Sequence, residues 1–174
     1  MKTIFAYTDG SAVVAGKHKG KGGFGTYFPD LNGEKKAFSL GFHKGKTGQM
    51  EVMALLYAIK AMSIDSAEPI KLIVYSDSEY VVKTFTENRL KRWIADGRLN
   101  QGGHAANKDL WNTIIRELNK RKHYLTLEMR HIKGHQVDRE KDPVRKNELM
   151  NDPHIFGNMV ADRLADYKRH KNLI

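Results

Sequence analysis

The chain has 174 residues, no cysteine and a formal net charge of +10, and 40% of its residues are hydrophobic. This size and composition predict one globular domain over residues 1–174. They exclude a mainly disordered chain, a disulfide-stabilised fold and chemistry based on a cysteine thiolate. Since the apolar stretch before Asp9 is too short for a signal peptide or a membrane span, we expect a cytoplasmic protein without membrane contact. The positive charge favours a nucleic-acid partner, but it would also fit a basic surface that only keeps the protein soluble.

The first part of the chain predicts an antiparallel meander. Residues 4–8 are rich in strand-forming side chains, and we expect this strand to end at the turn-forming pair Asp9 and Gly10. A glycine-rich loop follows. Two more strands are expected over residues 24–28 and 36–42, and the Asn32 and Gly33 pair between them predicts a hairpin turn.

The remainder alternates helices and strands. Residues 50–62 are apolar on most faces and predict a largely buried helix, and residues 71–75 predict a strand. Residues 76–78 can cap a helix that runs to residue 85, residues 89–95 form a basic helical stretch, and Asp109 can cap a helix to residue 121. A fifth strand over residues 125–132 and a final amphipathic helix complete an α/β fold, in which helices cover a mixed sheet.

Three acids stand at positions that suggest a function. Asp9 follows the first strand, Asp77 follows the strand over residues 71–75, and Glu51 lies inside the apolar helix. Each has an ordinary alternative: a turn for Asp9, a helix cap for Asp77 and a place at the rim of the core for Glu51.

The fold can bring these three carboxylates together. Neighbouring strands of one sheet can end side by side, and a helix packed across the sheet can place Glu51 over Asp9 and Asp77. Crowded carboxylates repel one another unless a cation neutralises them, and oxygen ligands suit Mg²⁺ or Mn²⁺ better than zinc. Two such metals can activate water and stabilise the leaving oxygen at a phosphodiester, which agrees with a nucleic-acid partner.

With these residues in place, the sequence resembles the type 1 ribonucleases H, in their prokaryotic or phage-like single-domain form, over nearly its full length. The matching residues are Thr8, Asp9, Gly10 and Ser11; Gly22, Gly23, Phe24 and Gly25; Met50 and Glu51; Ser76, Asp77, Ser78, Tyr80 and Val81; Leu110 and Trp111; Lys133, Gly134 and His135; and Gly157, Asn158, Ala161, Asp162, Leu164 and Ala165. The resemblance implies the ribonuclease H-like fold, a five-stranded mixed sheet of an antiparallel meander plus parallel strands, flanked by helices. It also implies hydrolysis of the RNA strand of RNA–DNA hybrids, which leaves 5′-phosphate and 3′-hydroxyl ends.

The resemblance assigns roles at the site. It implies that two Mg²⁺ ions, for which Mn²⁺ can substitute, are bound by four carboxylates, those of Asp9, Glu51, Asp77 and Asp162. His135 resembles a histidine that assists proton transfer or product release, and Asn158 resembles a residue that supports the site. Their ordinary alternatives are a solvated surface acid for Asp162, an exposed loop histidine for His135 and a helix-start cap for Asn158.

Substrate contacts are expected in two places near the carboxylates. Lys17 and Lys19 lie in a first loop that is longer and more basic than in the family, and they can reach phosphates there; the alternative is a flexible connection. Further contacts are expected from residues beside the carboxylates, namely Gly10, Ser11, Gln49 and Glu79, with Asn158 on the final helix. Many members of the family carry paired asparagines before the glutamate and a glutamine in place of Glu79.

A third group of contacts is expected from residues 87–99. Arg89, Lys91, Arg92 and Trp93 resemble the basic protrusion with which several members grip the DNA strand. Positive charge beside an aromatic ring suits a phosphate track with a platform for a sugar. The alternative is a solvated helix face with Trp93 in a local core.

The segment over residues 136–156 is predicted to be an extended loop, longer than in many members of the family. Its acids and histidine could form an additional metal site of Asp138, Asp142, Asp152 and His154. Interspersed lysines and arginines favour a solvated loop with a short helix after Pro143 instead. We expect a mobile flap that carries His135 beside the metals.

Two other functions remain open: a transposase- or resolvase-like DNA nuclease with the same general fold, and a non-catalytic hybrid-binding module. Four matching acids and His135 argue against a pure binder, and the lack of regions for partner assembly argues against a transposase. The expected partner is an RNA–DNA hybrid, bound by a monomer that needs no protein partner.

Overall fold

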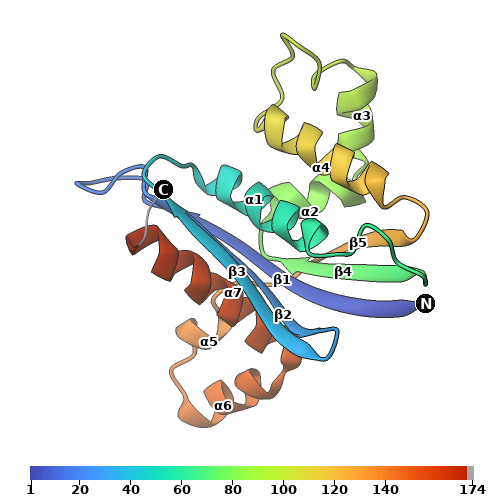
Figure 1. The fold of residues 1–174 in the computed structure, drawn as a ribbon. Coiled ribbons are helices and arrows are strands. Elements are labelled where there is room, and N and C mark those ends of the chain that lie inside the picture. Colours follow the sequence, from blue (N-terminus) through green and yellow to red (C-terminus); the bar gives the residue numbers. More distant parts are fainter. Residues whose placement is uncertain (172–174) are drawn as a thin grey trace.

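The computed structural model describes residues 1–171, and one five-stranded sheet forms its centre (Figure 1). Its strands are β1 (Lys2–Ala12), β2 (Gly22–Leu31), β3 (Glu34–Phe42), β4 (Ile70–Ser76) and β5 (Leu125–His131), in the order β3-β2-β1-β4-β5. The first three strands pair antiparallel, whereas β4 is parallel to β1 and β5 is parallel to β4. The predicted meander with parallel strands is therefore confirmed.

Helices cover both faces of this sheet (Figure 1). They are α1 (Thr47–Lys60), α2 (Glu79–Thr86), α3 (Arg89–Ala95), α4 (Lys108–Lys120), α5 (Gln136–Arg139), α6 (Pro143–Asn151) and α7 (Pro153–His170). One face packs against α1, with α4 beside it, while α7 crosses β1, β2 and β3 on the other face. α3 and α6 project at opposite ends of the molecule in Figure 1. Within residues 1–171, no helix is long and apolar enough to cross a membrane.

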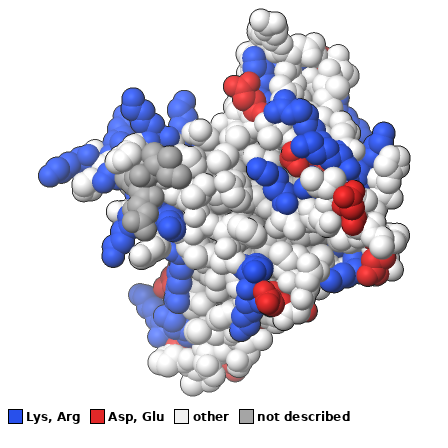
Figure 2. Space-filling view, in the orientation of Figure 1, with Lys and Arg blue, Asp and Glu red and all other residues white. Residues whose placement is uncertain are grey.

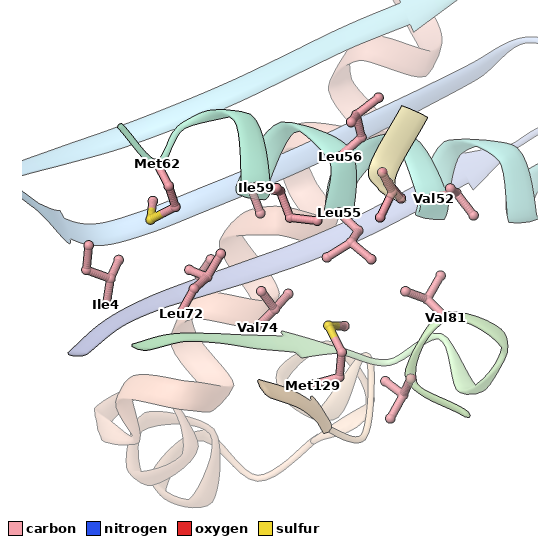
Figure 3. Packing of buried hydrophobic residues seen from close by; sticks show 14 of the residues in the cluster. Ile4, Val52, Leu55, Leu56, Ile59, Met62, Leu72, Val74, Val81 and Met129 are labelled. Atoms are coloured by element: carbon pink, nitrogen blue, oxygen red, sulfur yellow. The ribbon is translucent and has the colours of Figure 1, made fainter. Parts of the chain in front are cut away.

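The main core lies between the sheet and α1 (Figure 3). Alternate residues of a strand face opposite sides of a sheet, so Ile4 and Ala6 of β1 pack toward α1. Tyr7 points to the other face, where it joins a second cluster with Ala161 of α7. Because Asp9 follows Tyr7 at this spacing, its side chain is directed toward α7.

α7 lies unusually close to β2 at two glycines. A side-chain carbon added at Gly25 would lie 2.2 Å from the carbonyl oxygen of Ala161, and one added at Gly23 would lie 2.4 Å from that of Ala165. Only glycine permits this approach, since any larger residue would collide with the helix backbone. The glycines of β2 therefore fix the height of α7 above the sheet.

The first strand does not end where the sequence predicts. β1 continues through Asp9 and Gly10 to Ala12, because Asp9 pairs with Gly25 and Gly10 pairs with Phe24 of β2. The Asp-Gly pair favours a turn locally, but the antiparallel partner strand outweighs that preference. Asp9 thus lies inside a strand, and the prediction of a turn at this position is wrong.

One helix start differs from the prediction, and at a second the structure selects one of the three predicted capping residues. α4 begins after Asn107, which has a left-handed backbone and makes no side-chain cap, so Asp109 lies in the first turn and is not the cap. At α2, the cap is Ser78, whose hydroxyl accepts a hydrogen bond from the backbone of Val81, and not Asp77. Asp77 is therefore free of a capping role.

The segment over residues 136–156 is mostly helical, where the sequence predicts an extended loop. The short helix expected after Pro143 is confirmed as α6, whose first backbone N–H groups bond to the Asp142 carboxylate. Asp152 caps α7 in the same way, and Pro153 follows it at the first helical position. Since both aspartates are engaged as caps, the additional metal site that included them is not formed.

Candidate active site

Four carboxylates from four different elements line one hollow of about 390 Å³. Asp9 comes from β1, Glu51 from α1, Asp77 from the residue after β4, and Asp162 from α7. β1 and β4 are parallel neighbours, with Thr8 opposite Ser76. Asp9 and Asp77, the next residue of each, therefore lie side by side at one edge of this strand pair. The other lining residues are Gly10, Ser11, Ala12, Thr47, His135, Asp166 and Arg169. The structure thus brings together the four predicted metal ligands.

Glu51 is placed by a close contact between α1 and β1. A side-chain carbon at Gly10 would lie 2.1 Å from the backbone nitrogen of Glu51, so only glycine admits the helix here. The Glu51 carboxylate then accepts a hydrogen bond of 2.6 Å from the Ser78 hydroxyl. Glu51 is partly buried at the edge of the core, which agrees with a rim position and also with a place beside Asp9.

Burial raises the pKa of three of these carboxylates, and neighbouring charges add to the effect. Asp9 is 8% exposed, and burial, followed by the charges of Asp77 and Asp162, raises its pKa well above the ordinary value. Burial also raises the pKa of Asp162 and of Glu51. A hydrogen bond between the side chains of Asp9 and Asp162 favours the proton on Asp9. Such a group of acids favours a cation, because a cation neutralises the repulsion between neighbouring carboxylates.

His135 lies beside this group. Its backbone has φ 55°, in the left-handed region, which is uncommon for a residue other than glycine. Its Nδ1 lies 3.2 Å from an Asp162 carboxylate oxygen and 4.0 Å from Asp138, while the side chain stays about half exposed. Val137, in the short helix that follows, is buried and fixes this turn against the protein. His135 is thus an exposed loop residue that also contacts a proposed ligand.

Other polar groups of the 136–156 segment take different positions. Asp138, with His135 and Asp162, offers ligand atoms that all lie within 4.8 Å of one another. His154, by contrast, stacks on Tyr75 at 4.3 Å and bonds to the Tyr7 hydroxyl at 2.8 Å, so it anchors the start of α7 to the sheet.

Asn158 lies well inside α7, one turn before Asp162, and is 4% exposed. Its position excludes the helix-start cap that was the alternative reading. Its side-chain oxygen has no hydrogen-bond partner within residues 1–171, and the residue borders the same small cavity as His135 and Asp162.

The predicted contacts beside the carboxylates are only partly in the hollow. Gly10 and Ser11 line it directly. Gln49 lies in the first turn of α1, where its side-chain oxygen accepts a hydrogen bond from the backbone of Lys46. Glu79 begins α2 and pairs with Lys83, with its carboxylate exposed. Neither Gln49 nor Glu79 therefore lines the hollow.

The predicted basic contacts lie at the periphery. Figure 2 shows Lys and Arg side chains gathered at the end where Figure 1 places the β1–β2 loop, and that loop holds the exposed Lys17 and Lys19. A second group covers the part of the molecule with α3 and α4. There Lys91 and Arg92 are exposed.

Two residues of the predicted protrusion have intramolecular partners. Arg89 pairs with Glu87 at 2.7 Å. Trp93 packs edge-on against Trp111 with ring centres 6.0 Å apart and adjoins the main core. Trp93 thus holds α3 to α4, in agreement with the local-core alternative, and keeps a partly exposed ring.

Sequence reasoning missed Asp166 and Arg169 of the hollow, and the contact of Ser78 with Glu51. The spacing of α7 contained a signal for the first two, since residues 158, 162, 166 and 169 recur at intervals of four and three and share one helix face. For Ser78, the capping role was predicted, but nothing in the sequence indicated its bond to Glu51.

Comparisons with known proteins agree with this geometry. The sequence profile of the RNase H family matches residues 1–169. Ribonuclease H of Lachnoclostridium phytofermentans is 32% identical over 168 residues, which cover 94% of this chain and 99% of that protein. Ribonuclease H of Hahella chejuensis is 34% identical over 136 residues, or 78% of this chain and 83% of that one.

Solved structures share the fold. The RNase H domain of prototype foamy virus matches with a TM-score of 0.64 and 22% identity over 96% of this chain and 94% of its own. A foamy viral protease-reverse transcriptase in complex with an RNA/DNA hybrid matches with a TM-score of 0.68 and 20% identity; the match covers 96% of this chain and 20% of that one. A match of the profile to nearly the whole chain, together with these relatives, shows that the chain belongs to the RNase H family.

Proposed function

We propose that this protein is a divalent-metal-dependent endonuclease that hydrolyses the RNA strand of RNA–DNA hybrids and leaves 5′-phosphate and 3′-hydroxyl ends. The observation that carries the proposal is the convergence of four carboxylates, from β1, α1, the end of β4 and α7, in one hollow. The exposed lysines and arginines around it and the ribonuclease H relatives support the same activity.

The four carboxylates fit a pair of Mg²⁺ ions. Asp9, Glu51, Asp77 and Asp162 offer only oxygen donors, which suit Mg²⁺ and its substitute Mn²⁺. Burial raises the pKa of three of them because a buried carboxylate is costly to ionise, and bound cations would offset that cost. When bound, two such ions supply an activated water and stabilise the leaving oxygen of a phosphodiester.

The chain's own residues hold and assist this arrangement. The Ser78 hydroxyl orients the Glu51 carboxylate, and the Gly10 backbone N–H bonds to Asp9. His135 is exposed and reaches Asp162 through Nδ1, so it can take up a proton as the product forms or leaves. Asn158, one turn from Asp162, supports the placement of that carboxylate and the substrate beside it.

Binding of the duplex is proposed for the surrounding residues. Charged groups on the β1–β2 loop and α3 contact phosphates, and small or polar groups near the hollow contact the RNA strand, where 2′-hydroxyls distinguish it from DNA. The residues are Lys17, Lys19, Arg89, Lys91 and Arg92 for the phosphates, Trp93 for a sugar, and Gly10, Ser11, Gln49 and Glu79 near the hollow.

The test is cleavage of labelled duplexes by the purified protein. RNA–DNA hybrid, double-stranded RNA and double-stranded DNA are incubated with Mg²⁺, with Mn²⁺ or with EDTA. We expect cleavage of the RNA strand of the hybrid only, and only with a metal. Cleavage of double-stranded DNA would instead support a resolvase-like nuclease, and hybrid binding without cleavage would support a binding module.

We further propose that the protein acts as a monomer in the cytoplasm. Light scattering after size-exclusion chromatography should give the mass of one chain, 19.9 kDa. Cell fractionation should recover the protein with the cytosol, and a dimer mass or a membrane fraction would contradict this part of the proposal.

A further inference from the structure

Arg169 is the one lysine or arginine among the described residues that line the carboxylate hollow. It stands in the last turn of α7, where its Nη1 donates a hydrogen bond of 2.6 Å to the Ser11 hydroxyl. Its Nη2 lies 3.1 Å from a carboxylate oxygen of Asp166, and Ser11 donates to that same oxygen at 3.1 Å. Two groups from two elements therefore hold this guanidinium in one orientation.

The guanidinium keeps donors for a further partner. An arginine has five N–H donors; within residues 1–171, Nη1 donates one side-chain hydrogen bond, to Ser11, and Nη2 forms an ion pair with Asp166. The Nε is buried and has no hydrogen-bond partner there. The side chain is 24% exposed and lines the hollow, and since Nε is buried, the donors of the two Nη groups are the ones that a ligand can reach. A guanidinium held this way can form a bidentate hydrogen bond with an oxyanion without losing further conformational entropy.

A phosphate is the anion that fits this position. Five carboxylates line the hollow, so a nucleic-acid strand that enters meets negative charge on most sides. Metal ions would offset the repulsion at the phosphate that is cut, but the next phosphate of the same strand needs another cation. The exposed lysines of the β1–β2 loop and α3 lie outside the hollow lining, which leaves Arg169 for this role.

We propose that Arg169 binds a phosphate of the RNA strand adjacent to the one that is cut. Ser11 and Asp166 act as positioning residues, because they contact the guanidinium and fix its direction. This inference rests on the proposed ribonuclease activity, and it names the residue that sets the register of the RNA strand over the carboxylates.

The test combines the Arg169→Ala variant with hybrids in which single phosphates of the RNA strand are neutralised. A set of hybrids carries one neutral methylphosphonate each, at successive RNA positions around the cleavage site, and binding is measured in Ca²⁺ to prevent cleavage. With the wild-type protein, one position next to the cut should weaken binding about tenfold, as expected for a charge-assisted contact. With Arg169→Ala, that position should no longer matter, while the other positions keep their wild-type effects.

Matched variants separate phosphate binding from a structural role. Asp166→Asn should lose part of the binding penalty that the methylphosphonate causes at this position. Arg169→Lys should retain part of that penalty, since a lysine keeps the charge but cannot form a bidentate contact. Arg116→Ala removes an exposed arginine of α4 and should leave the positional profile unchanged. Thermal unfolding without metal checks each variant, and Arg169→Gln replaces the alanine variant if that one unfolds.

Two results would overturn the inference. One is a positional profile for Arg169→Ala that equals the wild-type profile, and the other is an equal loss at every position, which would indicate a structural lock. Failure of the proposed function gives a different result, because the wild-type protein would then cleave no unmodified hybrid in Mg²⁺.

Discussion

The carboxylate hollow and the basic segments around it are built in opposite ways. Asp9 and Asp162 are 8% and 7% exposed; a glycine next to Asp9 in β1 admits α1, and glycines of β2 admit α7, which carries Asp162. α3, by contrast, has no buried residue, and Lys91 of that helix is exposed, as is Lys17 of the β1–β2 loop. Chemistry at a metal site requires fixed distances, whereas affinity for phosphates sums many charges whose positions can vary. We therefore expect the rigid part to carry the reaction and the exposed part to carry the affinity.

The strongest test of this division is Asp77→Asn. Removing one proposed ligand should reduce cleavage in Mg²⁺ to background, while hybrid binding in Ca²⁺ stays near wild type because the basic segments are intact. Stability without metal should be preserved or rise, since one charge leaves a crowded group. Cleavage assays and fluorescence anisotropy measure the two effects. Near-normal activity in Mg²⁺ would rule out Asp77 as a ligand.

Gly10→Ala should damage the rigid part through packing alone. The added carbon must displace α1, whose backbone would lie 2.1 Å away, so we expect about 1–3 kcal/mol lower stability and a large loss of cleavage as Glu51 moves. Urea unfolding measures the first effect. Gly48→Ala in the first turn of α1 is the control, since its nearest neighbour would lie 3.7 Å away, and stability there should stay equal or increase.

His135→Ala should have an intermediate effect. The histidine contacts Asp162 but is not a proposed ligand, so turnover should slow moderately while Mg²⁺ binding persists. Single-turnover and steady-state cleavage are compared to separate chemistry from product release. Shortening residues 138–150, which include most of α6, should alter release more than chemistry if this segment acts with His135. Wild-type rates in both experiments would remove His135 and the segment from the mechanism.

Alanine at Arg89, Lys91 and Arg92 together should change binding more than turnover. The Michaelis constant for the hybrid should rise, and the logarithmic salt slope should fall by about one for each lost phosphate contact. Arg89 should contribute less than the other two because Glu87 already pairs with it. An unchanged slope would show that α3 is ordinary surface.

The smallest expected effect is a pH dependence of stability without metal. Burial and neighbouring charges raise the pKa of Asp9, so the folded protein holds a proton that the unfolded chain loses above about pH 3.8. The stability from this proton is complete below that pH and is lost as the pH rises through the raised pKa. In EDTA, wild type should therefore lose stability toward neutral pH relative to Asp9→Asn, as measured by urea unfolding. Unfolding free energies that change with pH in the same way in both proteins would contradict the raised pKa of Asp9.

The sequence predicted most elements, and the failures have physical causes. Strand and helix patterns located all five strands and the main helices, because β1 and β4 are buried on both faces and read as apolar runs. The end of β1 was missed since pairing with β2 overrides a local turn signal. Residue patterns alone also passed over Asp162, because a buried acid on an amphipathic helix looks like a surface acid until α7 is docked. Only the family resemblance pointed to it.

The contact of α7 with the β2 glycines has a consequence for synthesis of the chain. Three proposed ligands lie within the first 77 residues, but the fourth belongs to a helix that ends at His170. A ribosome-bound chain thus carries most of the ligand set long before it can hold Asp162 over the sheet. We therefore expect that a nascent chain still lacking α7 on Gly23 and Gly25 does not cleave nucleic acid.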